Sequence, residues 1–266
     1  MKKKNTNRLI RLTLLAILIA VELLMAFTPV GYIRLGVTSV TLLPVPVAIG
    51  AILLGPTAGG ILGAVFGLTS FYQCFGMDAL GVLLLDISPV GTFVMTVITR
   101  VLMGVCVGWL YKGLSKVKGK HFPTIAAVFS CAFVGLGLAV LFNNNGASPW
   151  NYLIGAVGAV LIGFLYHFIA SLDVAGAPSV LSSCSAAVLN TVFFVSALVL
   201  IFGNHPRVLE FTGQTNAWGI VVLLVTLNAV IEASVCLVIG TAVSKALSVL
   251  QRKLEAPQGT EESVSE

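Results

Sequence analysis

The chain alternates long apolar runs with short polar segments. A run of about 20 apolar residues is long enough for an α-helix to cross the hydrocarbon core of a bilayer. Strict alternation of apolar and polar residues is absent, so helices are favoured over a β-barrel. The pattern predicts an all-α integral membrane protein with eight apolar spans. These are Leu9–Phe27, the two helices of Val40–Tyr72, Val90–Tyr111, Phe122–Phe142, Tyr152–Leu172, Val180–Phe202 and Trp218–Leu247.

The stretch Val40–Tyr72 is predicted to be a hairpin of two membrane helices. It holds no charged residue and breaks at Gly55-Pro56, because Gly suits the position after a helix and Pro suits the first turn of the next. After the break, glycine recurs at every fourth position: Gly59, Gly63 and Gly67. These three positions share one helix face, where we expect another helix to approach closely. Gly104 and Gly108 repeat the spacing in a later span.

Composition and charge support a membrane protein and orient it. Hydrophobic residues make up 58% of the chain and charged residues only 9%, against about 25% charged residues in a soluble domain. The net charge of +5 comes from basic residues that flank apolar spans, which indicates membrane orientation rather than nucleic-acid binding. These residues gather before the first span, between Lys112 and Lys120, and after the last span.

An even number of spans places all three basic clusters on one side of the membrane. By the positive-inside rule that side is the cytoplasm, and both termini of this multi-pass plasma-membrane protein lie there. Six spans satisfy the rule as well, if the pair within Phe122–Leu172 does not cross. The segments predicted to face outward are Thr28–Thr38, Gln73–Pro89, Asn143–Asn151 and Gly203–Asn216.

Three charged residues lie within apolar spans, where a charge is costly and marks a functional candidate. Arg100 needs a carboxylate, several carbonyls or an anionic ligand. Glu232 has Asn228 four residues before it, on the same helix face. Either Arg100 and Glu232 form an ion pair that specifies packing, or Arg100, Asn228 and Glu232 line a polar ligand cavity. Glu22 either reaches water at the outer surface or has a function. Asn190 bonds a neighbouring helix or a substrate.

The predicted outer loop Gln73–Pro89 is long and polar. It holds Asp78 and Asp86 and follows directly on Tyr72. Long loops without structure of their own are often lids or binding loops, and a solvated connector is the alternative.

Several kinds of chemistry have no sequence support. The five cysteines show no C-x-x-C spacing and lie mostly in apolar runs, which is typical of buried inert thiols rather than a disulfide or metal framework. The chain has no Walker A, H-E-x-x-H or G-x-S-x-G motif. We therefore predict no enzyme activity of its own, no catalytic residue, no metal site and no cofactor, and transport cannot be powered by its own ATP hydrolysis.

Five segments of the chain, in order, resemble the substrate-binding S components of energy-coupling-factor (ECF) vitamin transporters. The most specific is V-P-V-A-I-G-A-I-L-L-G-P-T-A-G-G-I-L-G-A-V-F-G-L-T-S-F, which resembles the family's hairpin of helices two and three. The others are A-F-T-P-V-G-Y-I-R-L-G (Ala26–Gly36), T-R-V-L-M-G (Thr99–Gly104), L-N-T (Leu189–Thr191) and N-A-V-I-E-A (Asn228–Ala233). Ala16 and Ala20 occupy the place of the family's small-residue motif on helix one.

The resemblance implies a function and partners. An S component captures a vitamin from outside, docks on a transmembrane coupling subunit and two ATPase subunits, and topples in the membrane to release its cargo inward. Ala16 and Ala20 would contact the coupling subunit. The F-T-P-V-G-Y and G-L-T-S segments look most like pantothenate-type or unassigned members. Pantothenate is an anion, so Arg100 or Arg34 would meet its carboxylate. The expected substrate-binding residues are Arg34, Tyr72, Gln73, Arg100, Asn190, Asn228 and Glu232.

The chain departs from the family in one respect, which sets how we divide it into segments. Typical members have six helices, whereas two additional apolar runs precede Asn190 here. We therefore expect a six-helix core with an inserted helical hairpin. The segments are residues 1–121 (helices one to four), 122–172 (the inserted hairpin), 173–250 (the last two core helices) and 251–266 (a disordered cytoplasmic tail).

Two other function classes stay open at this point. One is a self-sufficient secondary transporter, although the chain shows no repeat of its Gly-Pro hairpin. The other is a membrane-embedded enzyme that uses Glu22, Glu232 or Asp86 as acid or base.

Overall fold

The structure is a computed structural model. It describes residues 2–29, 31–35, 38–116, 177–213, 215, 232, 236–240 and 242–243. The predicted hairpin 122–172 and the tail 251–266 lie outside these residues, as does Asn228. Eight spans therefore stay a prediction.

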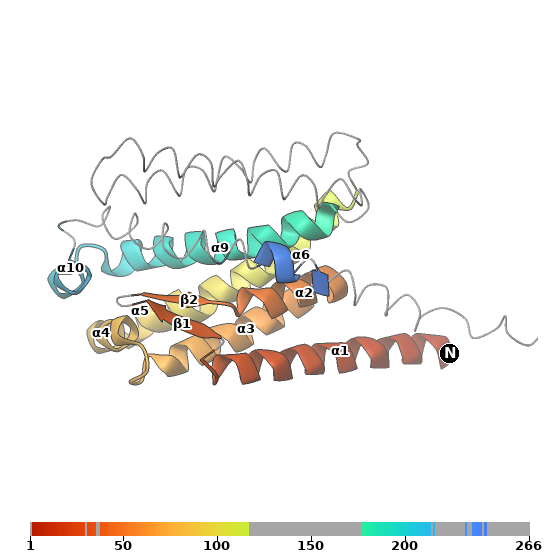
Figure 1. The fold of residues 1–266 in the computed structure, drawn as a ribbon, viewed down its shortest axis with the longest axis horizontal. Helices are drawn as coiled ribbons and strands as arrows, with labels where there is room; N and C mark the ends of the chain where they lie inside the picture. The colour runs from red at the N-terminus through yellow and green to blue at the C-terminus, as the bar shows by residue number, and fades with distance from the viewer. Residues whose placement is uncertain are drawn as a thin grey trace, which may run out of the picture.

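Long helices running side by side make up the body of the described chain (Figure 1). They are α1 (Lys2–Ala26), α2 (Pro44–Leu54), α3 (Pro56–Gln73), α6 (Thr99–Leu114) and α9 (Ala177–Phe202). Among the described residues, three helical stretches are long and apolar enough to cross a membrane: Arg8–Ala26, Pro89–Leu114 and Leu181–Phe202. The prediction of an all-α membrane protein is confirmed. α2, at 11 residues, is shorter than a usual span.

The turn between α2 and α3 forms as the Gly-Pro sequence predicts. Gly55 has a φ of 96°, a conformation that glycine adopts without strain, and Pro56 is the first residue of α3. The N–H of Gly55 donates to the carbonyl of Ala51 at 3.1 Å. Arg11 of α1 donates from Nη2 to the carbonyl of Leu54 at 2.7 Å, so one of the free carbonyls at the end of α2 is paired.

The glycine face of α3 packs directly on the backbone of α6. A Cβ added at Gly63 would collide with the carbonyl of Arg100, and one at Gly59 would collide with the carbonyl of Gly104. Gly108 likewise lies against Pro56. The predicted close helix contacts are confirmed, and they place Arg100 beside α3.

A β-hairpin follows α1 where a loop and the start of a helix were predicted. β1 (Tyr32–Leu35) pairs antiparallel with β2 (Thr38–Thr41), with Tyr32 opposite Thr41. The prediction that helix two begins near Val40 is wrong, since α2 begins at Pro44. Ile33, Thr38, Val40 and Thr41 are β-branched, which favours strands over helix.

The predicted outer loop Gln73–Pro89 is also largely ordered, so its description as a structureless loop is wrong. It contains α4 (Ala79–Ile87), whose first turn is capped by Asp78 accepting from the N–H of Gly81 at 2.8 Å. The next helix then starts as α5 (Pro89–Phe93), continues through a π-helical turn, η1 (Val94–Ile98), and becomes α6. The polar segment after α9 likewise contains α10 (Pro206–Thr212).

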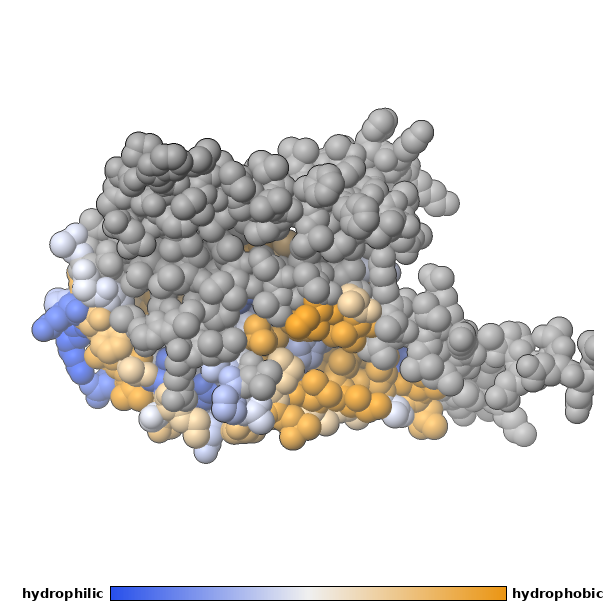
Figure 2. Space-filling model, in the orientation of Figure 1, coloured by the Kyte–Doolittle hydropathy of each residue, from blue (hydrophilic) through white to orange (hydrophobic). Residues whose placement is uncertain are grey.

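The hairpin, α4 and α10 lie at the same end of the helices, opposite the N-terminus (Figure 1). Asp86 of α4 and Arg207 of α10 form an exposed ion pair of 2.8 Å. Figure 2 shows hydrophilic residues at the end that carries α10 and hydrophobic residues along the helices. We call the β-hairpin, α4 and α10 together the outer cap.

Candidate functional site

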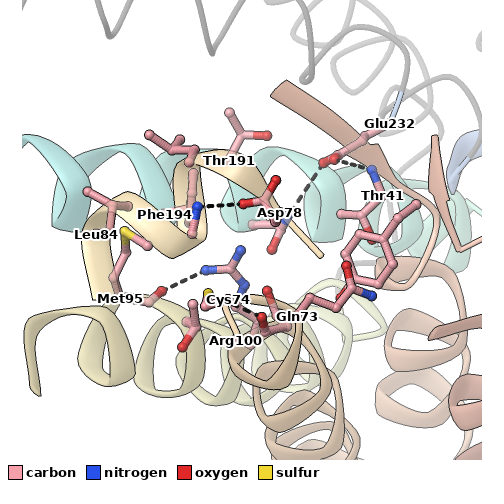
Figure 3. A pocket seen from close by; sticks show the side chains of 16 residues that line it. Thr41, Gln73, Cys74, Asp78, Leu84, Met95, Arg100, Thr191, Phe194 and Glu232 are labelled. Carbon is pink, nitrogen blue, oxygen red and sulfur yellow. Dashed lines mark hydrogen bonds between the residues drawn. The ribbon is translucent and has the colours of Figure 1, made fainter. Parts of the chain in front are cut away.

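One cavity lies between the outer cap and the helices (Figure 3). The volume that the centre of a water molecule can occupy inside it is about 70 Å³. Its lining comes from β1, β2, α3, α4, η1, α6, α9 and Glu232. The polar lining residues are Tyr32, Thr41, Ser70, Gln73, Asp78, Thr96, Arg100, Asn190, Thr191 and Glu232.

The π-helical turn η1 positions the guanidinium of Arg100. Its Nη1 donates to the carbonyl of Met95 at 2.6 Å and to Oγ1 of Thr99 at 3.0 Å. The guanidinium carbon lies 4.5 Å from the ring centroid of Phe194 and 5.4 Å from that of Phe66. π-helical turns are frequent at functional sites, and aromatic faces stabilise a cation. Arg100 is thus held in place by neutral groups.

Arg100 has no carboxylate within ion-pair distance among the described residues, although it is only 5% exposed. Glu232, also buried, uses its two oxygens elsewhere. Oε1 accepts from the backbone N–H of Thr41 at 3.0 Å, and Oε2 accepts from Nδ2 of Asn190 at 3.2 Å. Figure 3 shows Glu232 beside Thr41 and Arg100 beside Met95. The structure therefore contains the cavity but not the Arg100–Glu232 ion pair considered from the sequence.

Three buried polar atoms that line the cavity have no hydrogen-bond partner in the described part of the chain. They are Nε of Arg100, Oδ1 of Asn190 and the hydroxyl of Tyr32. The first is a donor, the second an acceptor, and the third can be either. Buried polar groups are normally paired, so these atoms are suited to a ligand that brings both acceptors and donors.

Tyr32 and Gln73 separate the cavity from an outer groove. Burial raises the pKa of Tyr32, so its phenol stays protonated. Nε2 of Gln73 donates to the carbonyl of Ala26 at 3.1 Å, which ties the end of α3 to the end of α1. On the other side lies the groove, lined by Ala26, Phe27, Thr28, Pro29, Tyr32, Gln73 and Met77.

The structure brings together four of the seven predicted substrate-binding residues: Gln73, Arg100, Asn190 and Glu232 line the cavity. Tyr72 does not, because its side chain is 53% exposed and its ring packs edge-on against Phe27, with centroids 5.9 Å apart. Arg34 lies in β1 opposite Ser39, and its side chain is outside the described structure. Asn228 is outside it altogether.

Sequence reasoning missed several lining residues. Thr96 lies four residues before Arg100, and Phe194 four residues after Asn190. Helical spacing alone could have found them, because residues four apart share a face. Tyr32 and Thr41 gave no such signal, since they reach the cavity through the unpredicted β-hairpin.

A protein-family model described as "ECF transporter, substrate-specific component" matches residues 10–244 of the chain. The chain is also similar to the "Pantothenate transporter PanT" of Leuconostoc mesenteroides subsp. mesenteroides, at 31% identity over 148 residues that cover 53% of this chain and 68% of the relative. It is 23% identical over 211 residues to the "Pantothenic acid transporter PanT" of Lactococcus lactis subsp. cremoris, covering 78% of this chain and 77% of the relative.

Proposed function

We propose, from the premise that the chain belongs to the family of substrate-specific components of ECF transporters, that its cavity binds pantothenate from outside the cell. A substrate-specific component captures its vitamin and leaves the driving force to other subunits. The names of the two relatives, both pantothenate transporters, support the choice of vitamin.

One observation carries this proposal: Arg100 is a buried cation in a cavity without a carboxylate partner among the described residues. A guanidinium keeps its charge inside a protein, and an anion is the ligand that best compensates it. Pantothenate supplies a carboxylate for Arg100. Its hydroxyl and amide groups match the unpaired Oδ1 of Asn190 and the hydroxyl of Tyr32. We assign the carboxylate to Arg100, and keep Arg34 and Asn228 as further candidate contacts.

The exposed face of α1 supports a docking role. Ala16 and Ala20 are exposed on this helix, beside exposed hydrophobic residues such as Ile17 and Val21. We propose that this face meets a transmembrane coupling subunit that carries two ATPase subunits. With both termini in the cytoplasm, the outer cap and its cavity face outward. On this proposal the chain has no catalytic activity and does not transport alone.

Calorimetric titration of the purified chain with pantothenate tests the proposal. We expect Arg100→Ala to weaken binding by about 10- to 150-fold, the effect of losing a hydrogen bond to a charged group worth about 1.5–3 kcal/mol. Arg8→Ala, which removes an exposed arginine of α1 outside the cavity lining, is the matched control. Unchanged affinity in Arg100→Ala, or no binding to the folded wild-type protein, would contradict the proposal.

A further inference from the structure

Glu22 of α1 is a buried carboxyl that the cavity description does not use. Its side chain is 0% exposed, and neither Oε1 nor Oε2 has a hydrogen-bond partner in the described part of the chain. It does not reach water, which was one of the two possibilities left open by the sequence. An ionisable residue inside a membrane helix is costly and marks a functional site by default.

Helical spacing places Glu22 behind the cavity wall. Leu18, Glu22 and Ala26 are four residues apart and all buried, so they form one inward stripe of α1. The carbonyl of Ala26 accepts the bond from Gln73, a cavity-lining residue at the end of α3. Glu22 therefore lies one turn further inside than this bond. Tyr32, which lines the cavity, packs against the apolar cluster that contains Leu18 and Ala26, the neighbours of Glu22 on this stripe.

The charged groups around Glu22 do not stabilise its ionised form. Of the elements that pack on α1, α2 has no titratable side chain, and α3 has only Tyr72, which is half exposed. β1 contributes the buried phenol of Tyr32, whereas the side chain of Arg34 is outside the described structure. Arg100 bonds Met95 and Thr99 and makes no contact with Glu22 among the interactions described. A carboxylate without a cation or a donor is strongly destabilised when buried, so this conformation requires the neutral acid.

We propose that Glu22 is a proton-binding site linked to ligand binding in the cavity. The inference rests on the proposed function, in which Arg100 holds an anion. When the bond between Gln73 and Ala26 is open, water reaches Glu22 and the carboxyl can ionise. Closing this bond over the bound ligand removes that water, and an ionised Glu22 would also repel the anion. Closure therefore moves one proton from water to a Glu22 oxygen, and no covalent bond to the ligand forms.

Calorimetry in two buffers with different enthalpies of ionisation measures this proton directly. We expect pantothenate binding to the wild-type chain to take up as much as one proton, in the pH range where Glu22 of the open protein is ionised. Affinity should fall by up to about tenfold per pH unit as pH rises through that range. In Glu22→Gln, proton uptake should vanish and affinity should become independent of pH. Asp86→Asn, which neutralises an exposed carboxyl, should keep the wild-type uptake.

The outcomes separate this inference from the proposed function. Absence of pantothenate binding to the folded wild-type protein defeats both. Binding without proton uptake between about pH 5 and about pH 9, or equal uptake in Glu22→Gln, defeats only the linkage. If Glu22→Gln does not fold, wild-type protein treated with dicyclohexylcarbodiimide replaces it, because this reagent blocks protonated buried carboxyls. Modification mapped to Glu22 by mass spectrometry must then abolish the uptake, and persistence of the uptake after that modification overturns the proposal.

Discussion

The two sides of the cavity are held by different means. One side depends on the contact between α3 and α6, and the other on the contacts of the outer cap. α3 and α6 meet backbone to backbone through glycines, so that even a methyl group at Gly63 or Gly59 finds no room. The cap instead meets the helices through side chains: α4 and α10 pack on η1 and α9 in an apolar cluster that includes Leu80, Leu84, Met95, Leu198, Phe202 and Val208. The N–H of Thr41 in the β-hairpin also donates to Glu232, and beside the cap a single bond from Gln73 to Ala26 ties the end of α3 to the end of α1.

This difference indicates which side of the cavity moves. Separating α3 from α6 would expose close-packed backbone and lose many dispersion contacts at once. Opening the wall that Tyr32 and Gln73 form between cavity and groove breaks the bond from Gln73 to Ala26, which water can replace at a net cost of about 0.5–1.5 kcal/mol. We therefore expect the wall that carries Arg100 to be the rigid side of the cavity, and the wall between cavity and groove to be the side that opens to a ligand.

Gly63→Ala should disrupt the contact between α3 and α6, and we expect it to have the largest effect of the variants compared. The added Cβ would collide with the carbonyl of Arg100, and overpacking of this kind costs about 1–3 kcal/mol. We expect a lower thermal midpoint together with weaker pantothenate binding, because Arg100 is displaced. Gly60→Ala is the control, since its Cβ meets only a side-chain methyl of Val105. Equal stability and affinity in the two variants would show that the contact does not position Arg100.

Gln73→Ala should test the other side of the cavity by weakening only the wall between cavity and groove. The variant loses the bond to the carbonyl of Ala26 and opens the wall between cavity and groove. A hydrogen bond worth about 0.5–1.5 kcal/mol corresponds to a two- to tenfold faster dissociation of pantothenate, measured by stopped flow. Leu68→Ala, at an exposed position of the same helix, should leave the rate unchanged. A dissociation rate equal to wild type would argue against this bond as a closure of the cavity.

The same contrast explains how much the sequence predicted. The glycine spacing of α3 and the break at Gly55-Pro56 depend on local geometry, and both predictions are confirmed. Arg100 and Glu232 were found because a charge in an apolar run stands out. Tyr32 was missed because it reaches the cavity through strand pairing, which is a non-local contact.

The partners of the buried charges were also beyond sequence reasoning. An ion pair between Arg100 and Glu232 was one of two readings, yet Glu232 bonds the backbone of Thr41 and the side chain of Asn190 instead. Which of several polar groups a carboxylate meets depends on distances of a few ångströms between helices. Spacing along one helix does not determine those distances.

Asp86→Asn should have the smallest effect, because it breaks an exposed ion pair within the outer cap. The side chains of Asp86 and Arg207 are 64% and 54% exposed, and such pairs contribute about 0–1 kcal/mol. We expect pantothenate to dissociate at most about fivefold faster at low salt, and the difference from wild type to disappear at about 0.5 M salt, where exposed charges are screened. The double variant Asp86→Arg with Arg207→Asp restores a pair of opposite charges and should recover most of the wild-type rate. A change larger than that of Gln73→Ala would contradict this ranking, and the ion pair would then be the main closure of the cavity and the bond of Gln73 a minor one. A change that salt does not reduce would show that Asp86 does not act through its exposed ion pair.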